Sequence, residues 1–346
     1  MLCPTLKDLP PPPKDKTGWP WTEESPRLTP LMSDSSEWPT ISIVTPSYNY
    51  ARFIEETIRS VLLQGYPNIE YIIIDGKSSD NSAEIIRRYE KYLKFWTSEP
   101  DRGFGDAINK GYRYHTGRLF TWIGADDSFE PGCFKDVAEL HLQGYQFIIG
   151  ECLNITLNED FKIIEEIRHS SVPQTFDQYI EWWSHKYIPQ PSAFMTKNLS
   201  DKALPLDSRI LMDFGFFLRV MKQNPYSIWT PKLWTKARFH GKNISRGPII
   251  LNNYLSMHEI AVEEAVKAYG PWKRLIFRIK SSDNLLFFKL LLARDNDLTV
   301  IRLLKILASW PFVIRRPIFL KMFLRACIGE EKYLMLKKLI KRPSSI

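Results

Sequence analysis

The fold is decided by residues 41–75, which read ISIVTPSYNYARFIEETIRSVLLQGYPNIEYIIID. The segment begins with a short apolar run, Ile41 to Val44, which stops at Thr45-Pro46. Apolar residues then recur at helical spacing until a glycine and a proline end the pattern, and Ile69 to Asp75 is a second apolar run. A buried strand, an amphipathic helix and another buried strand in this order are typical of a right-handed βαβ unit with parallel strands.

The same alternation continues along the chain. Helical periodicity predicts helices over 82–92 and 106–114, and short apolar runs predict strands over 95–97 and 119–123. We therefore predict an α/β domain over residues 41–250, Rossmann-like, with a mainly parallel sheet and flanking helices.

The two ends of the chain differ from this domain in composition. Residues 1–40 carry nine of the 24 prolines, so they form either an arm anchored on the body by Trp19 and Trp21 or a disordered leader. In residues 251–346 strand signals stop and apolar residues interleave with basic ones, which predicts a basic amphipathic helical region. This region either lies on an anionic membrane surface or packs on the domain as a helical subdomain with a solvated basic face.

The composition excludes several classes of protein. The 346 residues are 44% hydrophobic and 25% charged, which is ordinary for a globular protein and excludes a mainly disordered or collagenous chain. Residues 271–346 hold 17 of the 47 Lys and Arg and 5 of the 39 Asp and Glu, so the first 270 residues hold 30 basic against 34 acidic residues. Because a nucleic-acid-binding domain would carry a basic surface there, we expect no nucleic-acid partner.

Cysteine spacing and the N-terminal sequence indicate the compartment. The four cysteines lie far apart without the spacing of a zinc site, so we expect reduced thiols. The first residues, MLCPTLKDLPPPPK, lack an apolar core behind a basic head, so we expect no secretory signal. The sequence thus predicts a cytoplasmic protein, peripheral on the inner face of the cell membrane if the basic region binds lipid.

Polar residues follow all four predicted strands: TPSYN at 45–49, DGKSSD at 75–80, EPDRG at 99–103 and GADD at 124–127. The carboxyl ends of parallel strands meet at one edge of a sheet, and ligands bind at that edge. The sequence has neither a GxGxxG after the first strand nor a Walker P-loop, so nucleotide phosphates would need another source of positive charge. Asp126 and Asp127 supply it indirectly, because two carboxylates suit Mg²⁺ or Mn²⁺ and such a cation can bridge diphosphate oxygens. The alternative for this pair is a turn or a helix cap, since Pro131-Gly132 open a helix shortly after.

These four motifs, in this order and spacing, resemble the GT-A fold, family 2 (inverting) glycosyltransferases of bacterial polysaccharide and lipopolysaccharide assembly. The resemblance covers about residues 41–250. It implies an enzyme that moves a sugar, with inversion, from a nucleotide-diphosphate donor to a hydroxyl of a glycan or lipid-linked acceptor. It also implies Mn²⁺ or Mg²⁺ as cofactor and uracil as the commonest donor base.

The resemblance implies roles for individual residues. The residues expected around the nucleotide-sugar are Pro46 and Tyr48 flanking the base, Asp75 hydrogen-bonding it, and Asp101, Arg102, Asp106 and Lys110 lining the pocket with Asn109 as support. Asp126 is expected to face the ribose or the donor sugar and Asp127 to bind the metal, although adjacent aspartates leave open which of them is the direct ligand. His240 is expected either to ligate the metal or to hydrogen-bond the diphosphate, with Lys242 offsetting its charge. The alternative for His240 is a structural role.

An inverting transfer needs one base that activates the acceptor hydroxyl. Asp213 is the candidate, because LMDFGFFLR at 211–219 resembles the acceptor-side helix of the family, with Gly215 in place of a second acid. The alternative for Asp213 is a helix cap that precedes core residues. Nearby, Trp182 and Trp183 either stack on a sugar or fill the core.

Two other functions compete with this prediction. A nucleotidyltransferase would have a Gly-rich basic loop after the first strand, and TPSYNYARF is neither. A non-catalytic nucleotide- or carbohydrate-binding scaffold on the same fold has no need of a metal pair, a candidate base and donor-pocket acids together. We therefore favour the glycosyltransferase.

Overall fold

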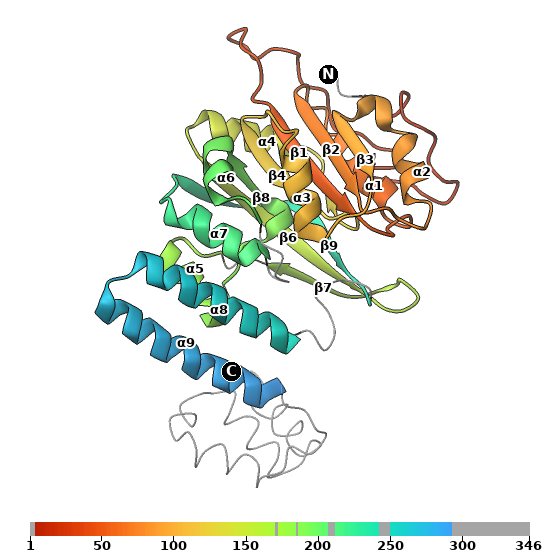
Figure 1. Ribbon diagram of the computed structural model, residues 1–346. Coiled ribbons are helices and arrows are strands. Elements are labelled where there is room, and N and C mark those ends of the chain that lie inside the picture. The colour runs from red at the N-terminus through yellow and green to blue at the C-terminus, as the bar shows by residue number, and fades with distance from the viewer. Residues whose placement is uncertain (1–3, 170–171, 185, 207–211, 242–249, 293–346) are drawn as a thin grey trace, which may run out of the picture. The chain divides into compact units, whose positions relative to one another are not determined.

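The computed structural model, shown in Figure 1, describes residues 4–169, 172–184, 186–206, 212–241 and 250–292. The chain divides into two compact units, residues 1–274 and 275–346. Within the described residues, the first unit contains one nine-stranded sheet, and the second contains the greater part of the last described helix.

The predicted βαβ units are present, and they build one half of the sheet. Its strands are parallel and lie in the order β3-β2-β1-β4. Their bounds are β1 (Ile41–Ser47), β2 (Ile69–Asp75), β3 (Phe95–Ser98) and β4 (Leu119–Trp122). The helices between them are α1 (Ile54–Leu62), α2 (Ser82–Arg87) and α3 (Phe104–Tyr112). A 3₁₀ turn (Glu90–Tyr92) follows α2. The α/β fold class and the four strands and three helices predicted here are therefore confirmed.

The other half of the sheet mixes directions. Its strands are β5 (Ser128–Phe129), β6 (Phe147–Leu157), β7 (Ile163–His169), β8 (Ala193–Thr196) and β9 (Ser227–Phe239). Strand β8 is antiparallel to β4 and β6, β9 is parallel to β6, and β5 is antiparallel to β9. Strand β7 extends β6 as a hairpin. The pairing of β5 with β9 matters most for function, because β5 directly follows the Asp126-Asp127 pair.

The remaining helices belong to the later part of the chain. They are α4 (Cys133–Leu142), α5 (Phe176–Ile180), α6 (Lys197–Ala203), α7 (Met212–Lys222), α8 (Ile250–Ala268) and α9 (Pro271–Leu292), with 3₁₀ turns at Trp182–Ser184 and Gln190–Ser192. Among the helices of the described ranges, none combines the length and the hydropathy that crossing a membrane requires.

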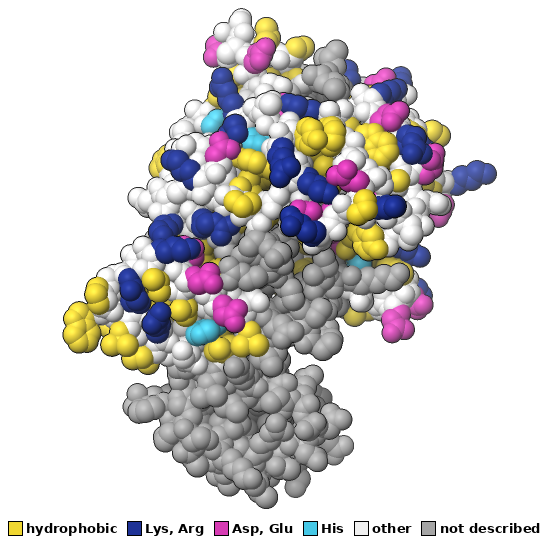
Figure 2. Space-filling model, viewed as in Figure 1, with side chains coloured by type: hydrophobic (Ala, Val, Ile, Leu, Met, Phe, Trp, Pro, Cys, Tyr) yellow, Lys and Arg dark blue, Asp and Glu magenta, His cyan; other side chains and the backbone are white. Residues whose placement is uncertain are grey.

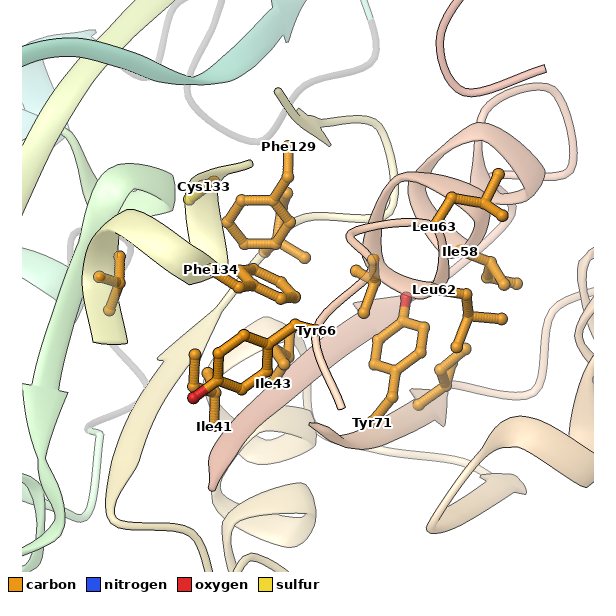
Figure 3. Close-up of a cluster of buried hydrophobic side chains, with 14 of the residues drawn as sticks. Ile41, Ile43, Ile58, Leu62, Leu63, Tyr66, Tyr71, Phe129, Cys133 and Phe134 are labelled. Carbon is orange, nitrogen blue, oxygen red and sulfur yellow. The ribbon is translucent and has the colours of Figure 1, made fainter. Parts of the chain in front are cut away.

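Both faces of the parallel half are buried, which explains why its strands read as continuous apolar runs. On one face, Ile41 and Ile43 pack with Ile58 and Leu62 of α1 and with Phe134 of α4 (Figure 3). On the other face, α3 approaches β1 so closely that a Cβ on Gly111 would lie 2.6 Å from Val44 Cγ1. A glycine at that position therefore allows the helix to lie against the strand.

The described part of the Pro-rich arm, residues 4–40, lies on the body. Leu9 and Trp21 are buried, and Trp19 and Leu28 pack against the hydrophobic core. The arm is therefore an ordered part of the first unit, anchored by the two predicted tryptophans. Cys133 and Cys152 are free and buried, in agreement with the expected reduced thiols.

On the face of the molecule shown in Figure 2, basic and acidic side chains are interspersed. Lys197–Asp201 and Arg102–Asp106 are two of the ion pairs formed by exposed or partly exposed side chains.

Candidate active site

The site is centred on the acidic loop, which we define as residues 124–127 after β4. Helix α1 fixes its backbone, because the Thr57 hydroxyl lies 2.6 Å from the carbonyl oxygen of Asp127 and 3.0 Å from that of Ala125. Gly124 has no room for a side chain, since a Cβ there would lie 2.8 Å from Asp126 Oδ1 and 3.1 Å from Asp127 Oδ2. The loop therefore places two carboxylates side by side over a glycine.

Strand β9 supplies the positive charge next to these carboxylates. The backbone N–H of Arg238 donates to Asp127 Oδ1 at 2.9 Å, and its guanidinium donates to the carbonyl oxygen of Asp126 at 2.8 Å. The guanidinium also forms an ion pair with Glu56 of α1. Arg238 thus connects the acidic loop to α1, and both charged side chains of the ion pair are largely buried.

His240 follows β9 and faces Asp126. Its Nε2 lies 3.3 Å from Asp126 Oδ2, and both side chains are almost fully buried. The imidazole stacks on Phe53 with a centroid distance of 5.1 Å, and Tyr50 and Phe161 lie near its other sides. The structure therefore brings together the three residues predicted to bind metal.

Burial and mutual repulsion affect the protonation of this group. Burial, and then the charge of Asp126, raises the pKa of Asp127 well above its usual range, although the N–H and guanidinium of Arg238 oppose the rise. Burial also raises the pKa of Tyr50, with further contributions from the two carboxylates and from the hydrogen bond that its hydroxyl donates to Asp126. A divalent cation would relieve the repulsion between adjacent buried carboxylates.

The residues present fit such a cation, although they do not enclose it. Within the described ranges, no group of three His, Cys, Asp or Glu side chains is arranged to hold a metal ion. Mg²⁺ sites in nucleotide-dependent enzymes use one or two carboxylates and complete the coordination with substrate phosphates and water. Asp126 and His240, with Asp127 beside them, match an open site of that kind.

The predicted base-binding residues lie at the ends of β1 and β2. Pro46 is buried in β1, whereas Tyr48 is 60% exposed in the loop that follows. Asp75 is fully buried, and its carboxylate accepts hydrogen bonds from the Ser78 backbone and hydroxyl and from the Ser98 hydroxyl. Asp75 is thus held at the strand end by Ser78 and by Ser98 of β3.

The β1–α1 and β2–α2 loops also bind each other. The Asn49 backbone, with φ of 61°, donates to the Ser78 hydroxyl at 2.8 Å, and the Asn49 side chain accepts from the Ser79 backbone. Asp80 accepts from the Ala51 backbone. The loops that follow β1 and β2 are therefore joined by hydrogen bonds, next to the exposed Tyr48 and the buried Asp75.

The other predicted donor-pocket residues cluster at the start of α3. Arg102 is an exposed side chain that forms an ion pair with Asp106 at 3.0 Å, and hydrogen bonds from Arg102 lower the pKa of Asp106. Burial raises the pKa of Asp101, which lies against Gly76 at the end of β2. Lys110 forms an ion pair with Glu99 at 3.1 Å and lies 3.9 Å from Asp106.

Asn109 has a structural role within this cluster. Its side chain donates to the Leu206 carbonyl oxygen at 2.8 Å and accepts from the Leu206 backbone N–H at 2.9 Å. The pair of bonds fastens α3 to the segment that leads to α7.

Asp213 lies in the first turn of α7, and burial raises the pKa of its carboxyl group. The same helix contacts the end of β4, because Phe216 and Phe217 pack on Trp122 with centroid distances of 5.0 and 5.9 Å. Gln190 donates to the Trp122 carbonyl oxygen at 2.6 Å and thus holds the loop before β8 at the same strand end. Helix α7 is therefore anchored at the strand that leads into the acidic loop.

Two further sequence predictions concern this side of the site. Trp182 is buried and packs on Trp183, which is partly exposed, so at least Trp182 is a core residue. Lys242 lies outside the described residues.

Several residues of the site were not predicted from the sequence: Tyr50, Phe53, Glu56, Thr57, Phe161 and Arg238. Arg238 stands two residues before His240, but nothing in the local sequence marks it as a site residue. These residues became visible only once the sheet had brought distant segments together.

Comparison with known proteins gives independent evidence. The model of glycosyl transferase family 2 matches residues 42–204. A proposed teichuronic acid biosynthesis glycosyltransferase of Bacillus subtilis, TuaG, is 35% identical over 108 residues, which are 30% of this chain and 41% of TuaG. An uncharacterized glycosyltransferase of Rickettsia conorii is 34% identical over 252 residues, which are 66% of this chain and 40% of that protein. The chain spans about a third to two fifths of the length of such curated relatives.

Solved structures support the fold. TarS 1–349 of Staphylococcus aureus matches with a TM-score of 0.53 and 16% sequence identity. The match covers 86% of this chain and 83% of the TarS chain. The structure of the same protein in complex with UDP-GlcNAc matches with a TM-score of 0.52 and 15% sequence identity. The match covers 83% of this chain and 79% of that chain. At this identity the likeness is one of fold, and it confirms the GT-A fold expected from the motifs.

Proposed function

Because this chain belongs to glycosyl transferase family 2 through residues 42–204, we propose that it is a metal-dependent inverting glycosyltransferase. It would move a sugar from a nucleotide-diphosphate donor to a hydroxyl of a glycan or lipid-linked acceptor. The observation that carries the proposal is the group formed by Asp126, Asp127 and His240 at the carboxyl end of β4, with Asp126 Oδ2 and His240 Nε2 3.3 Å apart.

We assign the nucleotide to the loops that follow β1 and β2, next to Tyr48 and Asp75. Asp75 is fully buried, but its carboxylate keeps accepting capacity after its three hydrogen bonds, so it would accept an N–H from a base once the loop at Ser78 moves aside. Uracil carries such an N–H, and TarS, which has a similar fold, is described in complex with UDP-GlcNAc and with UDP. The donor is therefore proposed to be a UDP-sugar. Its sugar moiety would lie near the start of α3, among Asp101, Arg102, Asp106 and Lys110.

Asp126, Asp127 and His240 would hold Mn²⁺ or Mg²⁺ against the diphosphate. The bound cation would act as a Lewis acid that stabilises negative charge on the departing nucleoside diphosphate. Arg238 would keep the two carboxylates in place by holding the backbone and side-chain atoms that it contacts.

Asp213 is proposed to accept the proton of the acceptor hydroxyl. Its raised pKa makes the carboxylate a better proton acceptor than an exposed aspartate, because burial destabilises the charged form. The anchoring of α7 on Trp122 and the position of Gln190 at the same strand end favour an acceptor site on this side of the acidic loop.

The acceptor is proposed to belong to surface polysaccharide or lipopolysaccharide synthesis. The similarity to TuaG favours polysaccharide synthesis. For a lipid-linked acceptor, α9 would provide contact with an anionic membrane, since it exposes Leu275, Ile276 and Ile279 beside Arg278 and Lys280. Co-sedimentation with anionic vesicles that decreases at high salt would support this contact, and absence of binding to any vesicle would refute it.

Release of nucleoside diphosphate tests the proposed activity. The chain is incubated with individual UDP-sugars and candidate acceptors in Mn²⁺ or Mg²⁺, and the anomeric configuration of the product is read by NMR. We expect Asp127→Ala and Asp213→Asn to lose turnover by at least about 100-fold. Asp201→Asn serves as the control, because Asp201 is paired with Lys197 on α6, outside the group around Asp126.

Two outcomes would contradict parts of the proposal. Undiminished turnover in both variants would remove the assignment of Asp127 and Asp213. UDP binding that depends on the metal, without turnover with any donor and acceptor, would favour a non-catalytic nucleotide- or carbohydrate-binding scaffold.

A further inference from the structure

The N-terminal arm is connected to the body through a buried arginine. Arg59 of α1 is fully buried, and its guanidinium donates to the carbonyl oxygens of Pro10, Pro20 and Trp21 at 2.9 to 3.0 Å. All three acceptors belong to the arm. Because a buried charge needs hydrogen-bond partners, the folded position of α1 depends on the arm lying in place.

The arm also contacts the segment that follows the acidic loop. The indole N–H of Trp19 donates to the carbonyl oxygen of Phe129 in β5 at 2.7 Å, and the Ser25 hydroxyl accepts from the backbone of Gly132. Phe129 stands two residues after Asp127. The arm therefore reaches the backbone next to the proposed metal site, although the family match begins only at residue 42.

Helix α1 completes the connection from its other side. Thr57 holds the acidic loop, the Ser60 hydroxyl accepts from the Phe129 backbone N–H at 3.1 Å, and Gln64 donates to the Glu130 carbonyl oxygen at 2.9 Å. The same helix carries Arg59. Residues 125–130 are thus held by α1 on one side and by Trp19 of the arm on the other.

We propose that the N-terminal arm positions the acidic loop for binding the nucleotide diphosphate, and that Trp19 is a positioning residue acting through its hydrogen bond to Phe129. This inference rests on the proposed function of the acidic loop. It gives the arm, which lies outside the family match, a role in the site.

Trp19→Phe tests the inference, because it removes the indole N–H and keeps an aromatic ring in the packed position. Trp38→Phe is a matched control: the Trp38 indole donates to the Thr29 carbonyl oxygen at 3.0 Å, and both of these residues belong to the arm. Both variants are made in the full chain. Hydrogen exchange of peptides covering residues 124–131, and the affinity for UDP in the presence of MnCl₂, are measured with thermal unfolding as a check of folding.

We expect exchange in residues 124–131 to become up to about five-fold faster in Trp19→Phe, which corresponds to one lost hydrogen bond. We also expect the affinity for UDP with Mn²⁺ to fall by at least about two-fold, with neither change in Trp38→Phe. Equal exchange in the two variants would overturn the inference. Should the wild-type chain fail to bind UDP with Mn²⁺, the proposed function would fall, while the exchange experiment would still decide whether the arm holds the loop.

Discussion

Replacement of Arg238 by methionine removes the charge that holds the acidic loop and keeps much of the side-chain volume. In the folded protein the guanidinium lies between Glu56 and the Asp126 carbonyl oxygen, and the exposed fractions of the Arg238 and Glu56 side chains are 12% and 19%. Removal of one partner from a buried ion pair leaves an uncompensated charge, which costs about 3–5 kcal/mol. Because this pair retains some exposure, we expect the free energy of unfolding to fall by about 3 kcal/mol, the lower end of that range.

Lys236→Met provides the control on the same strand. Lys236 forms an ion pair with Glu130 at 2.7 Å, but its side chain is 34% exposed. Exposed pairs contribute about 0–1 kcal/mol, so we expect a loss of at most about 1 kcal/mol. Urea denaturation of the full chain, followed by circular dichroism, measures both values.

A double-mutant cycle separates the ion pair from the general loss of contacts. Glu56→Gln should partly rescue Arg238→Met, because the neutral amide no longer leaves a buried charge without a partner. We expect a coupling energy of about 1–3 kcal/mol between the two substitutions. If Arg238→Met destabilises the protein no more than Lys236→Met, or if the two effects at 56 and 238 simply add, the role assigned to this ion pair is wrong.

Three further substitutions or conditions test other parts of the structure. Gly124→Ala should retain the fold but weaken the binding of UDP in the presence of Mn²⁺ by about ten-fold. The new Cβ would lie 2.8 Å from Asp126 Oδ1 and would displace that carboxylate. Isothermal titration calorimetry measures the affinity for UDP. Gly65→Ala should lower the free energy of unfolding, measured by urea denaturation, by at least about 2 kcal/mol. Gly65 has φ of 65°, and a Cβ there would lie 2.3 Å from the carbonyl oxygen of Pro26 in the arm. Unchanged stability would contradict the docked position of the arm. Burial lowers the pKa of His115 from 6.5 to about 4 in the folded protein, so the unfolded chain binds the proton at a higher pH than the folded chain does. The free energy of unfolding should therefore fall as the pH drops from 6.5 toward 4, by at most about 1.4 kcal/mol per pH unit. His115→Phe should flatten this pH dependence, and an identical slope in the wild type and the variant would refute the assignment.

The parallel half of the fold was predictable because its signals are local. The apolar run at 69–75 and the helical spacing before it determine a βαβ unit without reference to the rest of the chain. Because the carboxyl ends of parallel strands meet at one edge of the sheet, the positions of Asp75 and Asp126 directly after two such strands predict that both lie at that edge. Strands β5 to β9 were not predicted, because apart from the β6–β7 hairpin their pairings join segments far apart in the sequence and mix parallel and antiparallel directions.

The acids of the site could be predicted from the sequence, whereas the groups that hold them could not. Adjacent aspartates after an apolar run are visible in the sequence, but Arg238 meets Asp127 only because β9 pairs with β5, across 111 residues. Arg59 reads in the sequence as an ordinary surface residue of an amphipathic helix, and only the docked arm explains why it is buried. A chain that kept Asp126 and Asp127 but lost Arg238 or Trp19 would therefore show the same motif while lacking the contacts that hold the loop. For this site, measurements on the supporting residues discriminate between a working transferase and a mere sequence match more sharply than mutation of the aspartates alone.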